Sequence, residues 1–128
     1  MKSSQHEYAQ AAFEGIKSLD ANSIVAQQYG QLCHRFPSLV LTNGLRLAVT
    51  FFQAKSESVE SPHALYLQHM RSALGLDKSW EEELKIQNAD YLHLSRRVLS
   101  ASVWFKRYAE AILKIEQGTE ALEQEDIL

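Results

Sequence analysis

Hydrophobic positions recur along this chain at three- and four-residue steps, the spacing of one buried face of an α-helix. The clearest case starts at Tyr91, where apolar or small side chains follow a seven-residue repeat in two rows. The rows are Tyr91, Val98, Phe105 and Ile112, and Leu94, Ala101, Tyr108 and Ile115. Unbroken heptads predict one helix of about 25 residues that packs against other helices and ends at Gly118.

Capping residues and helix breakers divide the rest of the chain into shorter helices. Ser3 or Ser4 can cap a first helix that ends near Asp20, and Asn22 or Ser23 can open a second one. The same signals predict helices from Pro62 to a stop at Gly75 and over residues 79–87, where Ser79 and Glu82 form a capping box.

Residues 36–55 permit two interpretations. The Val- and Thr-rich segments on either side of Asn43-Gly44 could be two strands of a hairpin. Neither segment alternates apolar and polar residues, however, and a lone hairpin would lack a third strand. The favoured prediction is that Pro37 kinks or restarts the helix, which then runs to Leu41, bends at residues 42–44 and continues from Leu45 to about Ser56.

The chain is long enough to bury an ordinary apolar core, with 128 residues of which 45% are hydrophobic. We therefore predict an all-α fold, a compact single-domain bundle of about five to six helices with a long C-terminal helix. The domain covers residues 1–117, and residues 118–128 are expected to form a flexible acidic tail. A single cysteine and no apolar stretch of membrane-spanning length predict a soluble, cytoplasmic protein.

The residues that commonly carry catalysis do not form recognisable motifs. The five histidines have no metal-binding spacing, and no glycine-rich phosphate loop is present. Glu81, Glu82 and Glu83 lie in a predicted first helical turn, where acids stabilise the helix. Cys33 lies on an apolar face, as a buried small side chain would. We expect no catalytic residue, no metal and no cofactor.

Charge is distributed unevenly along the chain. Residues 116–128 contain five acids and no base, so residues 1–115 carry 13 basic against 11 acidic side chains. On the predicted last helix, Arg96, Arg107 and Lys114 fall within about 20° of one another, opposite the Tyr91 row, and Arg97 and Lys106 widen this basic row. Such a row either follows nucleic-acid phosphates or is simply solvated. No aromatic residue is clearly free to stack on bases; Trp104 is the only candidate near this row, and half-buried packing is the favoured interpretation of it.

Two segments resemble a known family. The first is Tyr29 to Lys55, with Leu32, Pro37, Leu39, Val40, Asn43, Gly44, Leu45, Ala48, Phe51 and Lys55 as its skeleton. The second is Tyr91 to Ala109, which ends in Trp104-Phe-Lys-Arg-Tyr-Ala109. With an N-terminal helix containing Ala9, Ala12 and Phe13, they are similar to the small subunit of the type III-B CRISPR effector, the Cmr complex, over Tyr8 to Leu113.

The resemblance implies a non-catalytic, all-helical subunit of an RNA-guided antiviral ribonucleoprotein. Its partners would be the other effector subunits, copies of itself in a head-to-tail stack, and guide and target RNA. The candidate RNA-binding residues, each as a phosphate contact, are Arg35, Arg46, Lys55, Arg96, Arg97, Lys106 and Arg107. Leu41 stands where family members can carry a basic residue, so no phosphate contact is expected there.

Two alternatives remain open at this point. The small subunit of the related type III-A effector, the Csm complex, would share the architecture and the role. A helical adaptor that binds only protein would leave the basic row solvated.

Overall fold

The computed structural model describes residues 4–114, all of whose regular elements are helices. They are α1 (Ser4–Lys17), α2 (Ile24–Asn43), α3 (Leu45–Lys55), α4 (Pro62–Leu74), α5 (Trp80–Glu83), α6 (Asn88–Tyr108) and the π-helical turn η1 (Ala109–Leu113). The predicted all-α bundle with a long last helix is confirmed, and the hairpin alternative for residues 36–55 is wrong. The boundary at residue 117 and the predicted tail lie outside the described residues.

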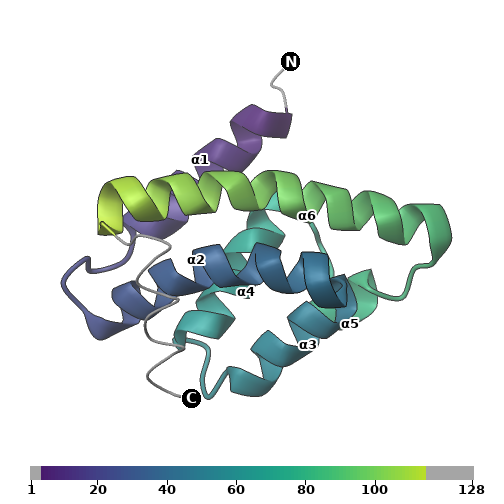
Figure 1. Ribbon diagram of the computed structural model, residues 1–128, viewed down its shortest axis with the longest axis horizontal. Coiled ribbons are helices and arrows are strands. Elements are labelled where there is room, and N and C mark those ends of the chain that lie inside the picture. Colours follow the sequence, from purple (N-terminus) through teal and green to yellow (C-terminus); the bar gives the residue numbers. More distant parts are fainter. Residues whose placement is uncertain (1–3, 115–128) are drawn as a thin grey trace.

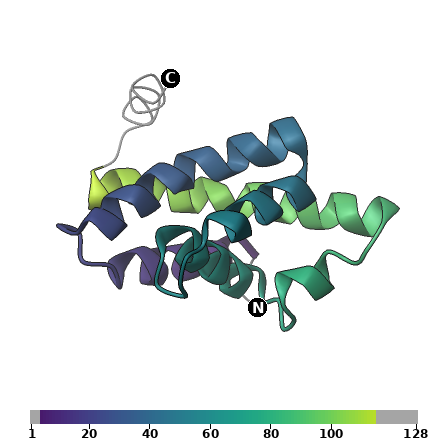
Figure 2. The same cartoon turned by 90° about the horizontal axis from the view of Figure 1, so that it is seen from below.

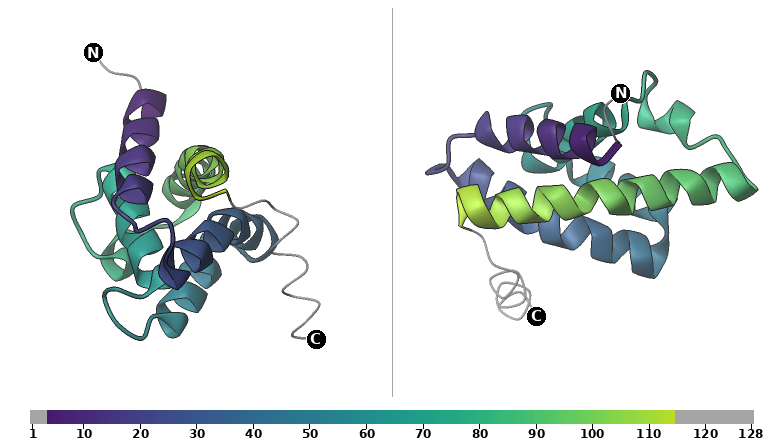
Figure 3. Two further views of the ribbon diagram at one scale, coloured as in Figure 1. Left: turned by 90° about the vertical axis from the view of Figure 1, so that its left-hand side faces the viewer. Right: turned by 90° about the horizontal axis from the view of Figure 1, so that it is seen from above.

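The long helix α6 organises the bundle. Figures 1 and 2 show α6 alongside α2, and the right panel of Figure 3 shows α1 on its other side. Helix α4 also packs against α6, and α3 packs against α2 and α4. In Figure 1 and the left panel of Figure 3, α3 therefore lies on the opposite side of the bundle from α1.

The predicted heptad rows of α6 face this core. Leu94, Val98, Ala101 and Phe105 are buried, whereas Tyr91 is half-buried. The centre of the core is aromatic, with the Tyr66 ring 5.1–5.8 Å from the rings of Tyr29, Phe36, Phe52 and Phe105. These contacts join α2, α3, α4 and α6 through one side chain. Each buried aromatic pair adds to the stability gained from apolar burial.

Several helix ends follow the predicted signals. Ser23 caps α2, its hydroxyl accepting a hydrogen bond from the Ala26 N–H, and the Ser79 hydroxyl accepts one from the Glu82 N–H. Gly75 ends α4 in the left-handed conformation at φ 68°. Gly44 separates α2 from α3 at φ 89°, a backbone conformation that favours glycine.

Three predicted boundaries are wrong. Pro37 neither ends nor restarts α2, which runs unbroken to Asn43. Helix α5 ends at Glu83, where the Lys85 N–H donates to the Glu82 carbonyl three residues back. The Leu84 and Ile86 carbonyls of the segment that follows accept hydrogen bonds from the Arg46 guanidinium. Helix α6 begins at Asn88 and passes into η1, after which Lys114 adopts a left-handed conformation.

Candidate nucleic-acid interface

The basic residues of α6 divide into exposed and anchored side chains. Arg96 and Arg107 are exposed, and the Arg107 guanidinium lies 5.1 Å from the Trp104 ring centroid. Trp104 is fixed in turn, because its indole N–H donates to Gln5 Oε1 of α1 at 2.8 Å. Lys106 is half-buried. Arg96 and Arg107 therefore form a basic row beside α1. Lys114 follows the π-helical turn and adopts a left-handed conformation, so the regular step of about 100° that predicted its place in this row does not apply to it.

Arg97 has a structural task that the sequence did not reveal. Its Nη2 donates a hydrogen bond to the Leu74 carbonyl, and its Nε donates to the Tyr8 hydroxyl at 3.3 Å. Leu74 is the last residue of α4, where carbonyl groups lack helical partners and attract a cation. Arg97 therefore ties α6 to the end of α4 and to α1, with fewer donors left for a phosphate.

Arg46 is engaged in a similar way at the start of α3. Its guanidinium donates to the carbonyl oxygens of Leu84 and Ile86 and lies 4.1 Å from the Tyr91 ring centroid. Its backbone N–H donates to the Tyr91 hydroxyl at 3.1 Å. Arg46 thus holds the segment between α5 and α6 against α3.

The structure brings Arg35 and Lys55 together around an aromatic ring. The Arg35 guanidinium carbon lies 5.8 Å and the Lys55 Nζ 5.5 Å from the centroid of the Phe51 ring, which is 37% exposed. Within residues 4–114, the basic and acidic side chains that approach within 4.0 Å are His34 with Glu110 and Lys85 with Glu82, so neither Arg35 nor Lys55 pairs with a carboxylate. Two cations therefore lie against one partly exposed ring, and neither has a carboxylate partner among the described residues.

His63, at the start of α4, completes this group of side chains. Its ring lies edge-on to Phe52 with the centroids 4.9 Å apart. Burial, and then the positive charges of Arg35 and Lys55, lower the pKa of His63 from its ordinary value. We call Arg35, Phe51, Lys55 and His63 the Phe51 cluster. Sequence reasoning missed Phe51 and His63; the four-residue step from Phe51 to Lys55 was the available signal.

Of the candidate site residues, Arg35 and Lys55 lie on one surface, and Arg96 and Arg107 lie on another. The Phe51 cluster belongs to α2, α3 and the start of α4, whereas Arg96 and Arg107 lie on α6 beside α1. Helices α1 and α3 are on opposite sides of the bundle in Figure 1. The described residues therefore do not present one continuous strip of basic side chains.

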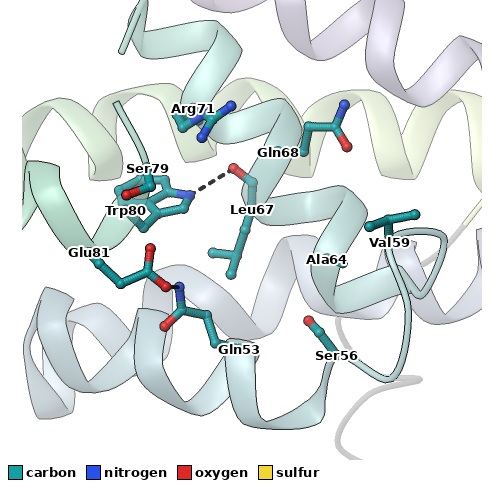
Figure 4. A pocket seen from close by; sticks show the side chains of 10 residues that line it. All are labelled: Gln53, Ser56, Val59, Ala64, Leu67, Gln68, Arg71, Ser79, Trp80 and Glu81. Carbon is teal, nitrogen blue, oxygen red and sulfur yellow. Dashed lines mark hydrogen bonds between the residues drawn. The ribbon is translucent and has the colours of Figure 1, made fainter. Parts of the chain in front are cut away.

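A separate hollow lies between α3, α4 and α5. This hollow has a volume of about 440 Å³, and Figure 4 shows Arg71 and Gln68 on its α4 side. Its wall is held by Trp80, whose indole N–H donates to the Leu67 carbonyl at 3.0 Å, and by Gln53, whose amide donates to Glu81 at 2.9 Å. This hollow adds one candidate cation, Arg71, and belongs to neither basic surface.

The groups capable of catalysis or metal binding are few. Cys33 is fully buried, and burial raises the pKa of its thiol well above the ordinary value, which keeps it protonated. Among residues 4–114, no cluster of three or more histidine, cysteine, aspartate or glutamate side chains could hold a metal ion. No helix within that range is long and apolar enough to cross a membrane.

Fold and surface together define a small helical protein that presents unpaired cations on two sides. Over residues 4–112, the chain matches the family described as CRISPR-associated protein (Cas_Cmr5). It is 26% identical over 114 residues to the CRISPR system Cmr subunit Cmr5 of Thermus thermophilus, a match that covers 89% of this chain and 99% of the relative.

A solved structure gives the same result. The X-ray crystal structure of a CRISPR-associated Cmr5 family protein from Thermus thermophilus has a TM-score of 0.77 and 28% sequence identity, over 88% of this chain and 99% of that one. The chain belongs to the Cmr5 family of CRISPR-associated proteins. This confirms the family that the two sequence segments predicted, the small subunit of the Cmr complex.

Proposed function

We propose that this protein is a non-catalytic, structural subunit of a cytoplasmic type III-B CRISPR effector, in which several copies stack and help to hold guide and target RNA through contacts with the phosphate backbone. Its partners are then the other effector subunits, further copies of the chain and the two RNA strands. The family match favours the type III-B complex over the related type III-A complex.

The observation that carries the RNA-binding part is the set of unpaired cations on the described surface. Arg35 and Lys55 lie against Phe51, Arg107 lies against Trp104, and Arg96 is exposed about three turns earlier on the same helix. Cations held against aromatic rings are directed toward the surface without a carboxylate to neutralise them. Such side chains fix a nucleic-acid backbone without reading its sequence.

Stacking compensates for the small number of contacts in one copy. The described residues carry 12 basic and 11 acidic side chains, a balance too even for tight binding by a single chain. Copies held in a row along one RNA would act together, so that each adds to the effective affinity of the others. A head-to-tail row requires two different contact surfaces on each copy.

The first test is purification of the tagged protein from its native host. Mass spectrometry of the bound proteins and end-labelling of bound nucleic acid, at low and moderate salt, show what it assembles with. We expect other CRISPR effector subunits together with a short RNA. Recovery of unrelated proteins without RNA would favour the adaptor alternative and would overturn the proposal.

The second test removes the α6 cations from the assembled complex. We expect Arg96→Ala with Arg107→Ala to lower retention of target RNA and to reduce the slope of log K against log salt by roughly one per lost phosphate contact. The matched control is Lys78→Ala with Lys85→Ala, which removes the same charge from the segments just before and just after α5. Equal losses in the two double variants would show a general charge effect and would contradict the contact.

A further inference from the structure

A groove between α2 and α3 combines positive charge with an apolar hollow. Gly44 is the single residue between α2 and α3, and the two helices pack against each other. Residues four apart on each helix lie on one face. On α2 this face carries Arg35, Leu39 and Asn43, and on α3 it carries Leu47, Phe51 and Lys55. We call these six residues the α2–α3 groove.

Contacts across the groove confirm that the two rows face each other. Arg35 reaches the Phe51 ring from α2. Closer to the Gly44 turn, a hollow of about 220 Å³ lies between the helices. Its lining residues are Leu39, Asn43, Leu47, Ala48 and Phe51. Leu47 is 60% exposed, so the hollow opens to solvent.

The two ends of the groove differ in chemistry. The end away from the turn holds the cations Arg35 and Lys55, with His63 beside them. The end near the turn is apolar, apart from the exposed amide of Asn43. Phe51 lies at the boundary and contributes to both ends. A ligand in which an anionic group is joined to a flat apolar group would match these two ends.

We propose that the α2–α3 groove binds one nucleotide of a single-stranded RNA, with its phosphate between Arg35 and Lys55 and its unpaired base in the hollow against Phe51. The inference rests on the RNA-binding function proposed above and assigns it a base contact in addition to backbone contacts. An apolar surface alone would suit a second protein chain equally well. The two cations without carboxylate partners favour the phosphate, and Asn43 can hydrogen-bond a base edge.

His63 provides a reporter at the phosphate end. The positive charges of Arg35 and Lys55 oppose protonation of its ring, and a phosphate bound between them would offset those charges. The pKa of His63 should therefore rise when RNA binds. Its ring proton resonances can be followed by NMR at protein concentrations high enough for weak binding.

The experiment compares two probes on the full-length chain at low salt. One probe is a uridine hexanucleotide, and the other is an abasic hexamer with the same ribose-phosphate backbone. The variants are Phe51→Leu, which removes the ring from a partly exposed position, and Phe51→Tyr, which retains it. Far-UV circular dichroism shows that each variant keeps its helix content.

We expect the wild-type protein to bind the uridine probe at least about five-fold more tightly than the abasic probe. Phe51→Leu should reduce this preference to within about two-fold, whereas Phe51→Tyr should keep it. The pKa of His63 should rise with both probes, because both carry phosphates. Equal binding of the two probes by the wild-type protein, or a preference that survives Phe51→Leu, would overturn the base contact.

Failure of this inference can be distinguished from failure of the proposed function. If both probes raise the pKa of His63 but bind equally, backbone binding stands and only the base contact is overturned. If neither probe binds the wild-type protein, and the assembled complex retains as much RNA without Arg96 and Arg107 as with them, both the groove inference and the proposed RNA-binding function are overturned. If Phe51→Leu instead weakens self-association in sedimentation and leaves the base preference intact, the groove is a contact between copies.

Discussion

Neighbouring arginines in α6 have different tasks. Arg96 is exposed on the surface beside α1, whereas the Arg97 guanidinium donates to the last carbonyl of α4 and to the Tyr8 hydroxyl. On the sequence alone the two residues look equivalent, since both fall near one basic row of a helix. The contacts in the folded protein show that Arg96 lies on the surface and that Arg97 holds helices together.

This difference predicts unequal effects on stability. Arg97→Ala should lower the free energy of unfolding by about 1–3 kcal/mol, because a charged hydrogen bond to a helix-terminal carbonyl is lost. Arg96→Ala should change it by less than about 0.5 kcal/mol. Urea denaturation followed by circular dichroism measures both. Similar losses for the two variants would contradict the structural role of Arg97.

Two partly buried histidines make stability depend on pH. Burial lowers the pKa of His69, and burial together with Arg35 and Lys55 lowers that of His63. In the unfolded chain both protonate at their ordinary pKa near 6.5, so the unfolded state binds protons first as the pH falls. Their contribution to stability is therefore complete above about pH 6.5 and declines below it.

The measurement is urea unfolding from about pH 7.5 down to about pH 5, a range that spans the ordinary histidine pKa. We expect His63→Gln to reduce the loss of stability over this range relative to the wild-type protein. His69→Gln should do the same, but it also removes the 2.7 Å contact between the His69 ring and the Tyr29 hydroxyl. The control variant is His93→Gln, which replaces an exposed histidine of α6 outside both contacts. If the stability of His63→Gln falls with pH as steeply as that of the wild-type protein, His63 does not contribute to the pH dependence.

At the scale of the element, local signals predicted where helices begin better than where they continue. Ser23, Pro62 and Ser79 act within one helical turn, so the sequence alone indicates their effect. The continuation of α2 through Pro37 depends on packing, because Phe36 and Pro37 are both buried against the rest of the bundle. That packing outweighs the helix hydrogen bond that proline cannot donate.

The short α5 and the π turn show the same limit. A distant residue, Arg46, holds the segment after α5 through the Leu84 and Ile86 carbonyls, and no pattern near residue 84 could indicate this. In η1 the buried side chains are Ala109 and Leu113, a change of spacing that the heptad rows do not contain. The candidate site was predicted in part for the same reason. Arg35 and Lys55 were identified individually, but their meeting at Phe51 required the α2–α3 packing.

For the whole molecule, the distribution of charge matters more than its sum. Residues 116–128 carry five acids and lie outside the described structure, whereas the unpaired cations belong to the described residues. Negative charge anywhere on the chain opposes the approach of RNA at low ionic strength, and salt screens this effect.

Neutralising the acidic segment should therefore strengthen RNA binding. The variant replaces Glu116, Glu120, Glu123 and Glu125 with Gln and Asp126 with Asn, which changes the net charge from −3 to +2. We expect a Kd several-fold lower at about 50 mM salt and a smaller difference at about 200 mM, measured by fluorescence anisotropy. A Kd that does not change at low salt would show that the segment has no influence on binding.

The single glycine between α2 and α3 has a consequence for how a ligand would be received. Gly44 joins the two helices without a loop, and the packing of α2 and α3 against each other and against α4 fixes their relative position. The groove between them is therefore shaped when the protein folds, and little conformational entropy is lost when it is filled. A ligand would bind to such a preorganised groove and leave it quickly, because no rearrangement of the chain has to occur first.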